Sequence, residues 1–353
     1  MKIFQCQNCS HPVYFENVVC EKCHSWLGYL ADSNEMLALA PGKGPWLIDA
    51  QDGRPYAYCA NHQHKVCNWM VPVDAPGELC RACSLNDTIP NLQDPENLRQ
   101  WRELEEAKHR LVYSLLRLGL PVFNKDNAPK RGLAFDFLSD DDAEDQVMTG
   151  HDSGLVTINT NEADSVHREA TRIAMNERYR TLIGHFRHEV GHYYWDLLVA
   201  SNHKDLTGFR QLFGDERADY QEALKLHYQK GRSNDWMNTY ISSYATSHPW
   251  EDWAETWAHY LHLLAIVETA YSFGMQLTPR IPNSAVLSMN ARIDPYGEPD
   301  FRRIIDACVP LTFAVNSLNR VMGQEDLYPF VLNDAVREKL VFVHEVVRRG
   351  AGK

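Results

Sequence analysis

Residues 188–192 are His-Glu-Val-Gly-His, an HExxH pattern inside a stretch of helical periodicity. Four residues apart on a helix, the imidazoles of His188 and His192 lie on one face, where both can bind one zinc ion. Glu189 follows the first histidine, so its carboxylate can reach a water molecule in the open coordination position. Zinc lowers the pKa of that water, and Glu189 can accept its proton as the water attacks a carbonyl carbon. The pattern therefore predicts hydrolysis by a zinc-activated water.

A catalytic zinc ion of this kind needs a third protein ligand, and two later segments offer one. Glu251 follows Pro249, which can open a helix and so place the glutamate in its first turn. Asp215 and Glu216 are the other candidates and lie closer to the HExxH pattern along the chain. We expect Glu251 to be the ligand, while Asp215 or Glu216 remains the alternative.

The residues around Glu251 suggest further roles. Ala254 is small enough to let this helix pack close to the HExxH helix. Glu255 lies one turn after Glu251 and could orient a ligand histidine through a hydrogen bond. Tyr244 could donate its hydroxyl to the oxyanion that forms on the attacked carbonyl.

The cysteines are concentrated at one end of the chain, where eight of the nine precede residue 84. They form two groups of four, namely Cys6, Cys9, Cys20 and Cys23, then Cys59, Cys67, Cys80 and Cys83. Three C-x2-C pairs in such groups are typical of structural four-cysteine zinc sites in a reducing compartment. The second group starts with a wider C-x7-C pair, so His62 or His64 could replace Cys59 or Cys67. The ninth cysteine, Cys308, is expected to be buried.

Charge and hydropathy limit the partners. The formal net charge is -12, and residues 1–85 contain six basic and eight acidic side chains, which disfavours nucleic acid as a partner. No apolar run approaches the roughly 18 residues that a membrane span needs, and the N-terminus lacks the apolar region of a secretory signal. We therefore expect a cytoplasmic protein without a membrane partner. It would act on a peptide or protein substrate, and the cysteine-rich region could bind a protein partner.

Short strands and amphipathic helices are expected to position these residues. The predicted strands are 132–138, 147–151 and 154–160, and the last is a candidate edge strand for pairing with an extended peptide. The predicted helices cover about 96–119, 162–200 with a break near Gly184, 209–228, 251–270 and 333–349. Residues 84–97 are expected to form a polar linker, and residues 276–300 a loop.

Tyr244 lies seven residues before Glu251. HExxH followed by this spacing resembles the gluzincin peptidases of the Mlc titration factor and anthrax lethal factor kind. Nearly the whole chain also resembles bacterial zinc-binding metallopeptidases that carry an N-terminal zinc ribbon. The segments that carry this second resemblance include TIPNL, TGHDSGLVTIN, YRTLIGHFRHEVGHYYWD, LFGDERADY and HPWEDWAETWAHYLH. The resemblance implies an α+β fold, with a zincin-like metallopeptidase domain after two small zinc-ribbon modules.

We therefore predict tandem zinc ribbons at 1–85, a linker and helix at 86–130, and a zincin-like domain at 131–353. The zincin-like domain would combine a small mixed sheet, the HExxH helix and C-terminal helices. The predicted function is zinc-dependent peptide hydrolysis with one catalytic and two structural zinc ions. The predicted site consists of the ligands His188, His192 and Glu251, the base Glu189, the oxyanion donor Tyr244 and the orienting Glu255. The alternative function is a catalytically silent zincin-fold protein whose ribbons contact a protein partner.

Overall fold

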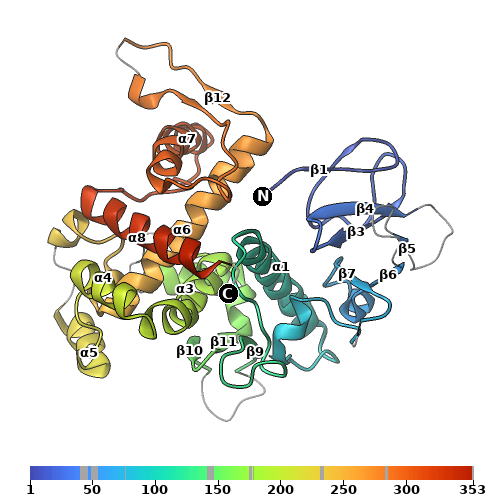
Figure 1. The fold of residues 1–353 in the computed structure, drawn as a ribbon, viewed down its shortest axis with the longest axis horizontal. Helices are drawn as coiled ribbons and strands as arrows, with labels where there is room; N and C mark the ends of the chain where they lie inside the picture. The colour runs from blue at the N-terminus through green and yellow to red at the C-terminus, as the bar shows by residue number, and fades with distance from the viewer. Residues whose placement is uncertain are drawn as a thin grey trace. The chain divides into compact units, whose positions relative to one another are not determined.

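The computed structural model describes residues 1–39, 47–48, 55–75, 77–140, 147–174, 177, 179–230, 234–282 and 285–351. The chain folds into two compact units, and Figure 1 shows its ribbon. Unit 1 comprises Met1–Leu116 and Val122–Thr171, and unit 2 comprises Arg117–Pro121 and Arg172–Lys353. Small sheets combine with helices, which confirms the predicted α+β class. The predicted boundaries at residues 85 and 130 do not coincide with this division.

The N-terminal part of unit 1 consists of short antiparallel strands. These are β1 (Phe4–Gln5) with β2 (Pro12–Val13), β3 (Trp26–Leu30) with β4 (Glu35–Leu39), and β5 (Leu47–Ile48) with β6 (Pro55–Tyr58) and β7 (Met70–Pro72). Aromatic rings join them to the long helix α1 (Pro95–Arg117). Phe15 lies edge-on to Tyr29 and to Tyr113 of α1, with ring centroids 4.7 and 5.3 Å apart. The cysteine-rich segment therefore shares its core with α1.

A four-stranded mixed sheet completes unit 1 in the order β10-β11-β9-β8. Its strands are β8 (Asn86–Thr88), β9 (Ala134–Leu138), β10 (Gly150–Asp152) and β11 (Leu155–Asn159). Ser153 and Gly154 both have positive φ, as the tight turn between β10 and β11 requires. Two predictions are wrong here. The polar segment 84–97 contains the strand β8, and β11 lies inside the sheet, so β10 and β8 are its edges.

Helices dominate unit 2. They are α3 (Leu182–Tyr194), α4 (His203–Phe213), α5 (Tyr220–Lys230), α6 (Pro249–Ser272), α7 (Phe301–Val321) and α8 (Asp334–Gly350), and α2 (Ser165–Ala174) crosses the division between the units. A hairpin of β12 (Gln276–Leu277) and β13 (Met289–Asn290) occupies part of the predicted loop. No helix in the described ranges is long and apolar enough to cross a membrane.

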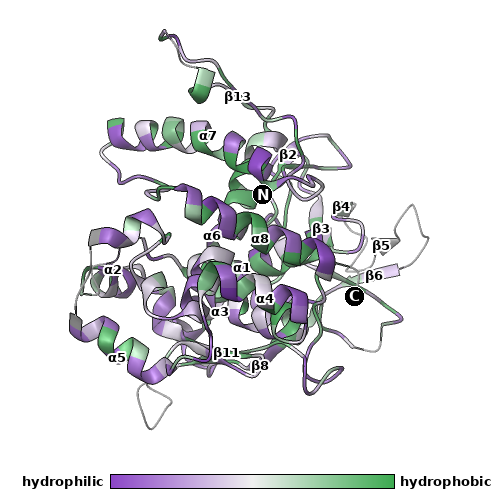
Figure 2. Cartoon of the chain, turned by 60° about the vertical axis from the view of Figure 1, so that its left-hand side comes forward, coloured by the Kyte–Doolittle hydropathy of each residue, from purple (hydrophilic) through white to green (hydrophobic). Residues whose placement is uncertain are grey.

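Three helix predictions need correction. The segment 162–200 divides into α2 and α3, but the break precedes Gly184, because the Thr181 side chain caps α3 by accepting from the backbone of Gly184. The segment 209–228 divides at Gly214, whose φ of 105° ends α4. Helix α7 was not predicted, although hydrophilic and hydrophobic residues alternate along it in Figure 2; Pro310 lies inside it and masks the pattern.

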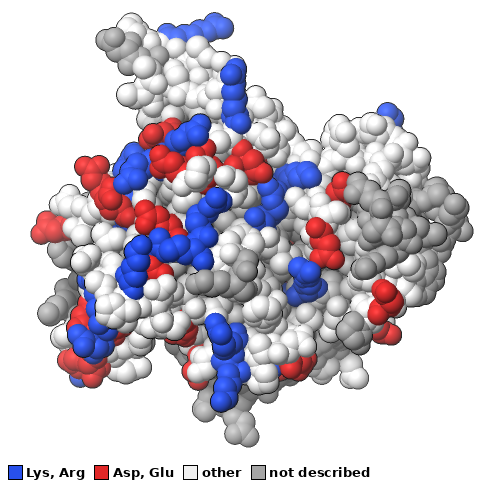
Figure 3. Space-filling view, viewed as in Figure 1, with Lys and Arg blue, Asp and Glu red and all other residues white. Residues whose placement is uncertain are grey.

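Exposed ion pairs cover part of unit 2. Basic and acidic side chains intermingle on the face shown in Figure 3. Arg302 pairs with Glu338 and Arg320 with Asp326, at 3.2 and 2.6 Å. Exposed pairs contribute only about 0–1 kcal/mol each, so the fold of unit 2 depends mainly on its buried helix contacts.

One of these contacts joins α3 to α6. A Cβ added to Gly191 would lie 3.0 Å from the Cα of Ala254 and 3.2 Å from the Cβ of Trp257. The indole of Trp253 donates a hydrogen bond of 2.8 Å to the carbonyl of Gly191. Because Gly191 has no side chain, the backbones of the two helices can approach this closely.

We predict that Gly191→Val destabilises unit 2 by about 1–3 kcal/mol, because the valine overpacks the contact with Ala254. The matched control is Gly297→Val, since a Cβ at Gly297 would meet only ordinary van der Waals contact at 3.8 Å. Thermal unfolding of both variants checks this expectation. Equal midpoints for the two variants would contradict the close approach of α3 and α6.

Candidate metal centres

The two histidines of the HExxH pattern face the first turn of α6. Nε2 of His188 lies 3.0 Å from Oε2 of Glu251, and Nε2 of His192 lies 3.5 Å from Oε1. One ligand atom from each of the three residues falls within 4.8 Å of the other two. The two histidines lie four residues apart on α3, so their side chains share one face of the helix. Pro249 and the side-chain cap from His248 start α6, which places the glutamate opposite them.

The distances suit a zinc ion. Zinc bonds of about 2.0–2.1 Å to nitrogen or oxygen, arranged as a tetrahedron, place neighbouring ligand atoms about 3.3 Å apart. Glu251 is 1% exposed, and an isolated carboxylate so deeply buried would be costly. Its burial raises the pKa of the carboxyl, but the neighbouring His192 and His188 more than offset this and lower that pKa well below its usual value. The donor set of His188, His192 and Glu251 therefore fits zinc.

A second carboxylate fixes the orientation of His188. Nδ1 of His188 donates to Oε1 of Glu255 at 2.7 Å, one helical turn after Glu251. Burial opposes ionisation of Glu255, but the hydrogen bond from His188 lowers the pKa of Glu255 below its usual value. Because Nδ1 carries this hydrogen, Nε2 is turned toward Glu251.

Tyr244 lies next to the HExxH histidines. The Tyr244 ring is 5.9 Å from the His188 ring, measured between centroids. Burial, and then the charge of Glu251, raise the pKa of Tyr244 far above its usual value, and the charge of Glu189 contributes in the same direction. Tyr244 therefore keeps its proton at neutral pH and can donate it in a hydrogen bond.

Tyr220 belongs to this centre as well and was not predicted. Tyr220 is the first residue of α5, and its hydroxyl donates a hydrogen bond of 2.8 Å to Oε1 of Glu251. Neither spacing nor residue type connects Tyr220 to Glu251 along the sequence, so only the folded loop between α4 and α5 reveals the contact.

The alternative ligands have other partners. Arg210 binds the Glu216 carboxylate, with Nε 2.9 Å from Oε2, and Arg217 binds both oxygens of Asp215. Among the described residues, Glu251 completes the histidine cluster, and neither Asp215 nor Glu216 belongs to it.

The first group of cysteines also converges. One sulfur pair, Cys6 with Cys23, is 3.6 Å apart, and the other, Cys9 with Cys20, is 3.6 Å apart. A tetrahedron with Zn–S bonds of about 2.3 Å has edges of about 3.8 Å, whereas a disulfide is only about 2.05 Å long. All four thiols are free and fit a zinc cage. Cys308 stays apart, and burial raises the pKa of its thiol to about 12.

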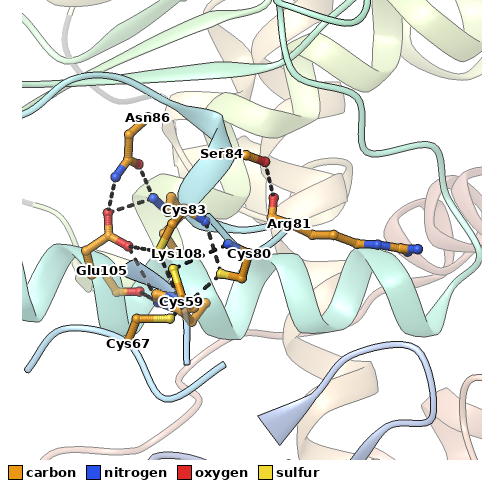
Figure 4. Close-up of polar contacts among 10 residues, drawn as sticks. Cys59, Cys67, Cys80, Arg81, Cys83, Ser84, Asn86, Glu105 and Lys108 are labelled. Atoms are coloured by element: carbon orange, nitrogen blue, oxygen red, sulfur yellow. Dashed lines mark hydrogen bonds and ion pairs between the residues drawn. The ribbon is translucent and has the colours of Figure 1, made fainter. Parts of the chain in front are cut away.

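The second group, drawn in Figure 4, is buried throughout. Cys59, Cys67, Cys80 and Cys83 lie together, and the sulfurs of Cys67 and Cys80 are 3.7 Å apart. His62 has another role, since its Nδ1 donates to the carbonyl of Cys67 at 2.8 Å while its ring stacks on Tyr58. Neither His62 nor His64 belongs to the cluster among the described residues.

Helix α1 supplies a buried ionic network beside this second group. The Cys83 sulfur lies 3.7 Å from Oε2 of Glu105 and 3.6 Å from Nε2 of His109. The Lys108 ammonium is 2.6 Å from the other oxygen of Glu105, and it also binds Asn86. Lys108 and Glu105 are fully buried, so the ammonium offsets negative charge next to the thiols.

A model of the family described as putative zinc-binding metallo-peptidase matches residues 97–346, and a zinc-ribbon domain model matches residues 3–94. Uncharacterized proteins of Mycobacterium bovis and of Mycobacterium tuberculosis strains CDC 1551 and H37Rv are each 43% identical to this chain over 347 residues. These residues are 98% of this chain and 95% of each relative. No solved structure matches the chain. The matches confirm the resemblance to zinc-binding metallopeptidases that carry an N-terminal zinc ribbon.

We predict that Lys108→Met destabilises unit 1 by about 3–5 kcal/mol, because it leaves the buried Glu105 carboxylate without its ammonium. The matched control is Lys225→Met, which removes an exposed ion pair with Glu222 and should cost less than about 1 kcal/mol. Thermal unfolding of the zinc-loaded proteins measures the difference. Similar midpoints for the two variants would show that the buried pair does not stabilise unit 1.

Proposed function

The chain belongs to the zinc-binding metallo-peptidase family whose model spans residues 97–346, and we propose that it is a zinc-dependent peptidase that hydrolyses peptide bonds. One observation carries the proposal. The three donors His188, His192 and Glu251 converge at a centre that also contains a carboxylate, Glu189, and a protonated phenol, Tyr244.

The charge of the centre suits catalysis. Two neutral imidazoles and one carboxylate leave a bound zinc ion with a formal charge of about +1, whereas four thiolates give about -2. A positive centre attracts electrons from a carbonyl, but a negative cage does not. We therefore assign catalysis to the centre on α3 and α6, and structural roles to the two cysteine sites.

Each residue then has a defined task. Zinc bound at this centre would lower the pKa of a coordinated water and polarise the scissile carbonyl. Glu189 accepts the proton of the attacking water and later delivers it to the leaving amine. Tyr244 donates a hydrogen bond to the carbonyl oxygen as negative charge develops there. Glu255 holds the His188 ring through the 2.7 Å hydrogen bond to Nδ1.

The competing function is a catalytically silent zincin-fold protein. Such a protein would need the metal ligands but not the base, because the ligands alone can stabilise the fold. The presence of Glu189 and Tyr244 beside the ligands favours the peptidase. The variant that distinguishes the two functions must therefore remove the base and keep the ligands.

We predict that Glu189→Gln lowers the rate of peptide cleavage by about 10²–10⁴-fold, because the amide cannot accept a proton. Cleavage of casein or of a peptide library should be inhibited by a chelator in the wild type and restored by zinc. Glu222→Gln, an exposed substitution on α5, is the matched control and should leave the rate unchanged. Full activity in Glu189→Gln would contradict the assigned mechanism. A wild type without chelator-sensitive cleavage would favour the silent protein.

We also predict three zinc ions per chain, one at the HExxH centre and two in the cysteine sites. His192→Ala removes one ligand of the catalytic ion and should reduce the content to two, while both cysteine sites stay loaded. Elemental mass spectrometry of dialysed protein measures this ratio. Three retained ions in His192→Ala would show that the third ion binds elsewhere.

A further inference from the structure

The Glu251 carboxylate has partners on two sides. Its Oε2 faces Nε2 of His188 at 3.0 Å, and its Oε1 accepts the Tyr220 hydroxyl hydrogen at 2.8 Å. Oε1 also lies 3.5 Å from Nε2 of His192. The phenol of Tyr220 thus binds the oxygen that does not face His188, and this restricts rotation of the carboxylate.

A hydroxyl donor is needed there once a metal is bound. Both histidines would then use the Nε2 lone pair for the metal, so neither Nε2 could donate a hydrogen to Glu251. The Tyr220 hydroxyl can still donate, because it does not compete for the metal. Glu251 is 1% exposed and cannot replace this hydrogen bond readily with one from bulk water.

Tyr220 itself is held by the loop that precedes it. His248 donates through Nε2 to the carbonyl of Ala218 at 3.1 Å, and its Nδ1 accepts from the backbone of Trp250. One imidazole therefore connects the residues before α5 with the first turn of α6, where Glu251 lies. The Tyr220 ring also packs edge-on against this imidazole, with centroids 5.2 Å apart.

We propose that Tyr220 is a positioning residue, which fixes the Glu251 carboxylate for metal binding. This inference rests on the proposed function, because it assumes that Glu251 binds the catalytic zinc. It also assigns a role to the segment LFGDERADY, in which Asp215 and Glu216 pair with arginines.

The test uses Tyr220→Phe, which removes one oxygen atom, with Tyr271→Phe on the exposed end of α6 as its matched control. Competition with a chelator of known affinity measures zinc binding at the HExxH centre while the cysteine sites stay loaded. We expect affinity at this centre to fall about 10–100-fold in Tyr220→Phe and to stay unchanged in Tyr271→Phe. Unfolding of the metal-free proteins shows whether either substitution harms the fold.

A spectroscopic readout separates positioning from a general loss of stability. Cobalt is placed at the HExxH centre while zinc occupies the cysteine sites, and its visible bands report the arrangement of the ligands. We expect the bands to change in Tyr220→Phe and to stay unchanged in Tyr271→Phe. Wild-type affinity and wild-type bands in Tyr220→Phe would overturn the inference and leave the proposed function intact. A wild type that binds no metal through His188 and His192 would instead overturn the proposed function itself.

Discussion

The approach of α3 to α6 at Gly191 is the contact on which the geometry of the HExxH centre depends. Gly191 precedes His192, and Ala254 follows Glu251 by three residues, so the contact and the ligands share the facing sides of the two helices. A Cβ at Gly191 would lie 3.0 Å from the Ala254 backbone, which is closer than ordinary packing allows. At a larger helix separation, Glu251 would no longer face Nε2 of His188, and Glu255 would no longer reach Nδ1. One small residue on each helix therefore sets the geometry of the ligands.

The N-terminal part of unit 1 has a small core, because its short strands bury little by themselves. The strands from β1 to β7 are two to five residues long, and strands this short provide only a small core. The two cysteine cages fit this need, since a structural metal replaces missing core and contributes folding energy directly. The aromatic contact of Phe15 with Tyr113, and the approach of Glu105 and His109 to the Cys83 sulfur, then connect this region to α1.

The features that could be predicted from the sequence are those whose geometry depends on residues close together along the chain. The HExxH pattern and the C-x2-C pairs each lie within a single turn, so their geometry follows from the chain alone. The choice of Glu251 as the third ligand needed the resemblance to known peptidases, because its approach to His188 depends on how α3 and α6 pack. Tyr220 could not be predicted, since the loop held by Ala218 and His248 turns it toward Glu251. The strand β8 was missed for a similar reason: its polar residues form a ladder only in the presence of β9.

Anomalous diffraction at the zinc edge tests the identity of the third ligand most directly. Crystals of the zinc-loaded chain should show a peak between His188, His192 and Glu251, with two further peaks inside the cysteine cages. We expect the Glu251 carboxylate to contact the first peak while Glu216 stays paired with Arg210. A first peak bound by Asp215 or Glu216, or no peak between the two histidines, would contradict this expectation.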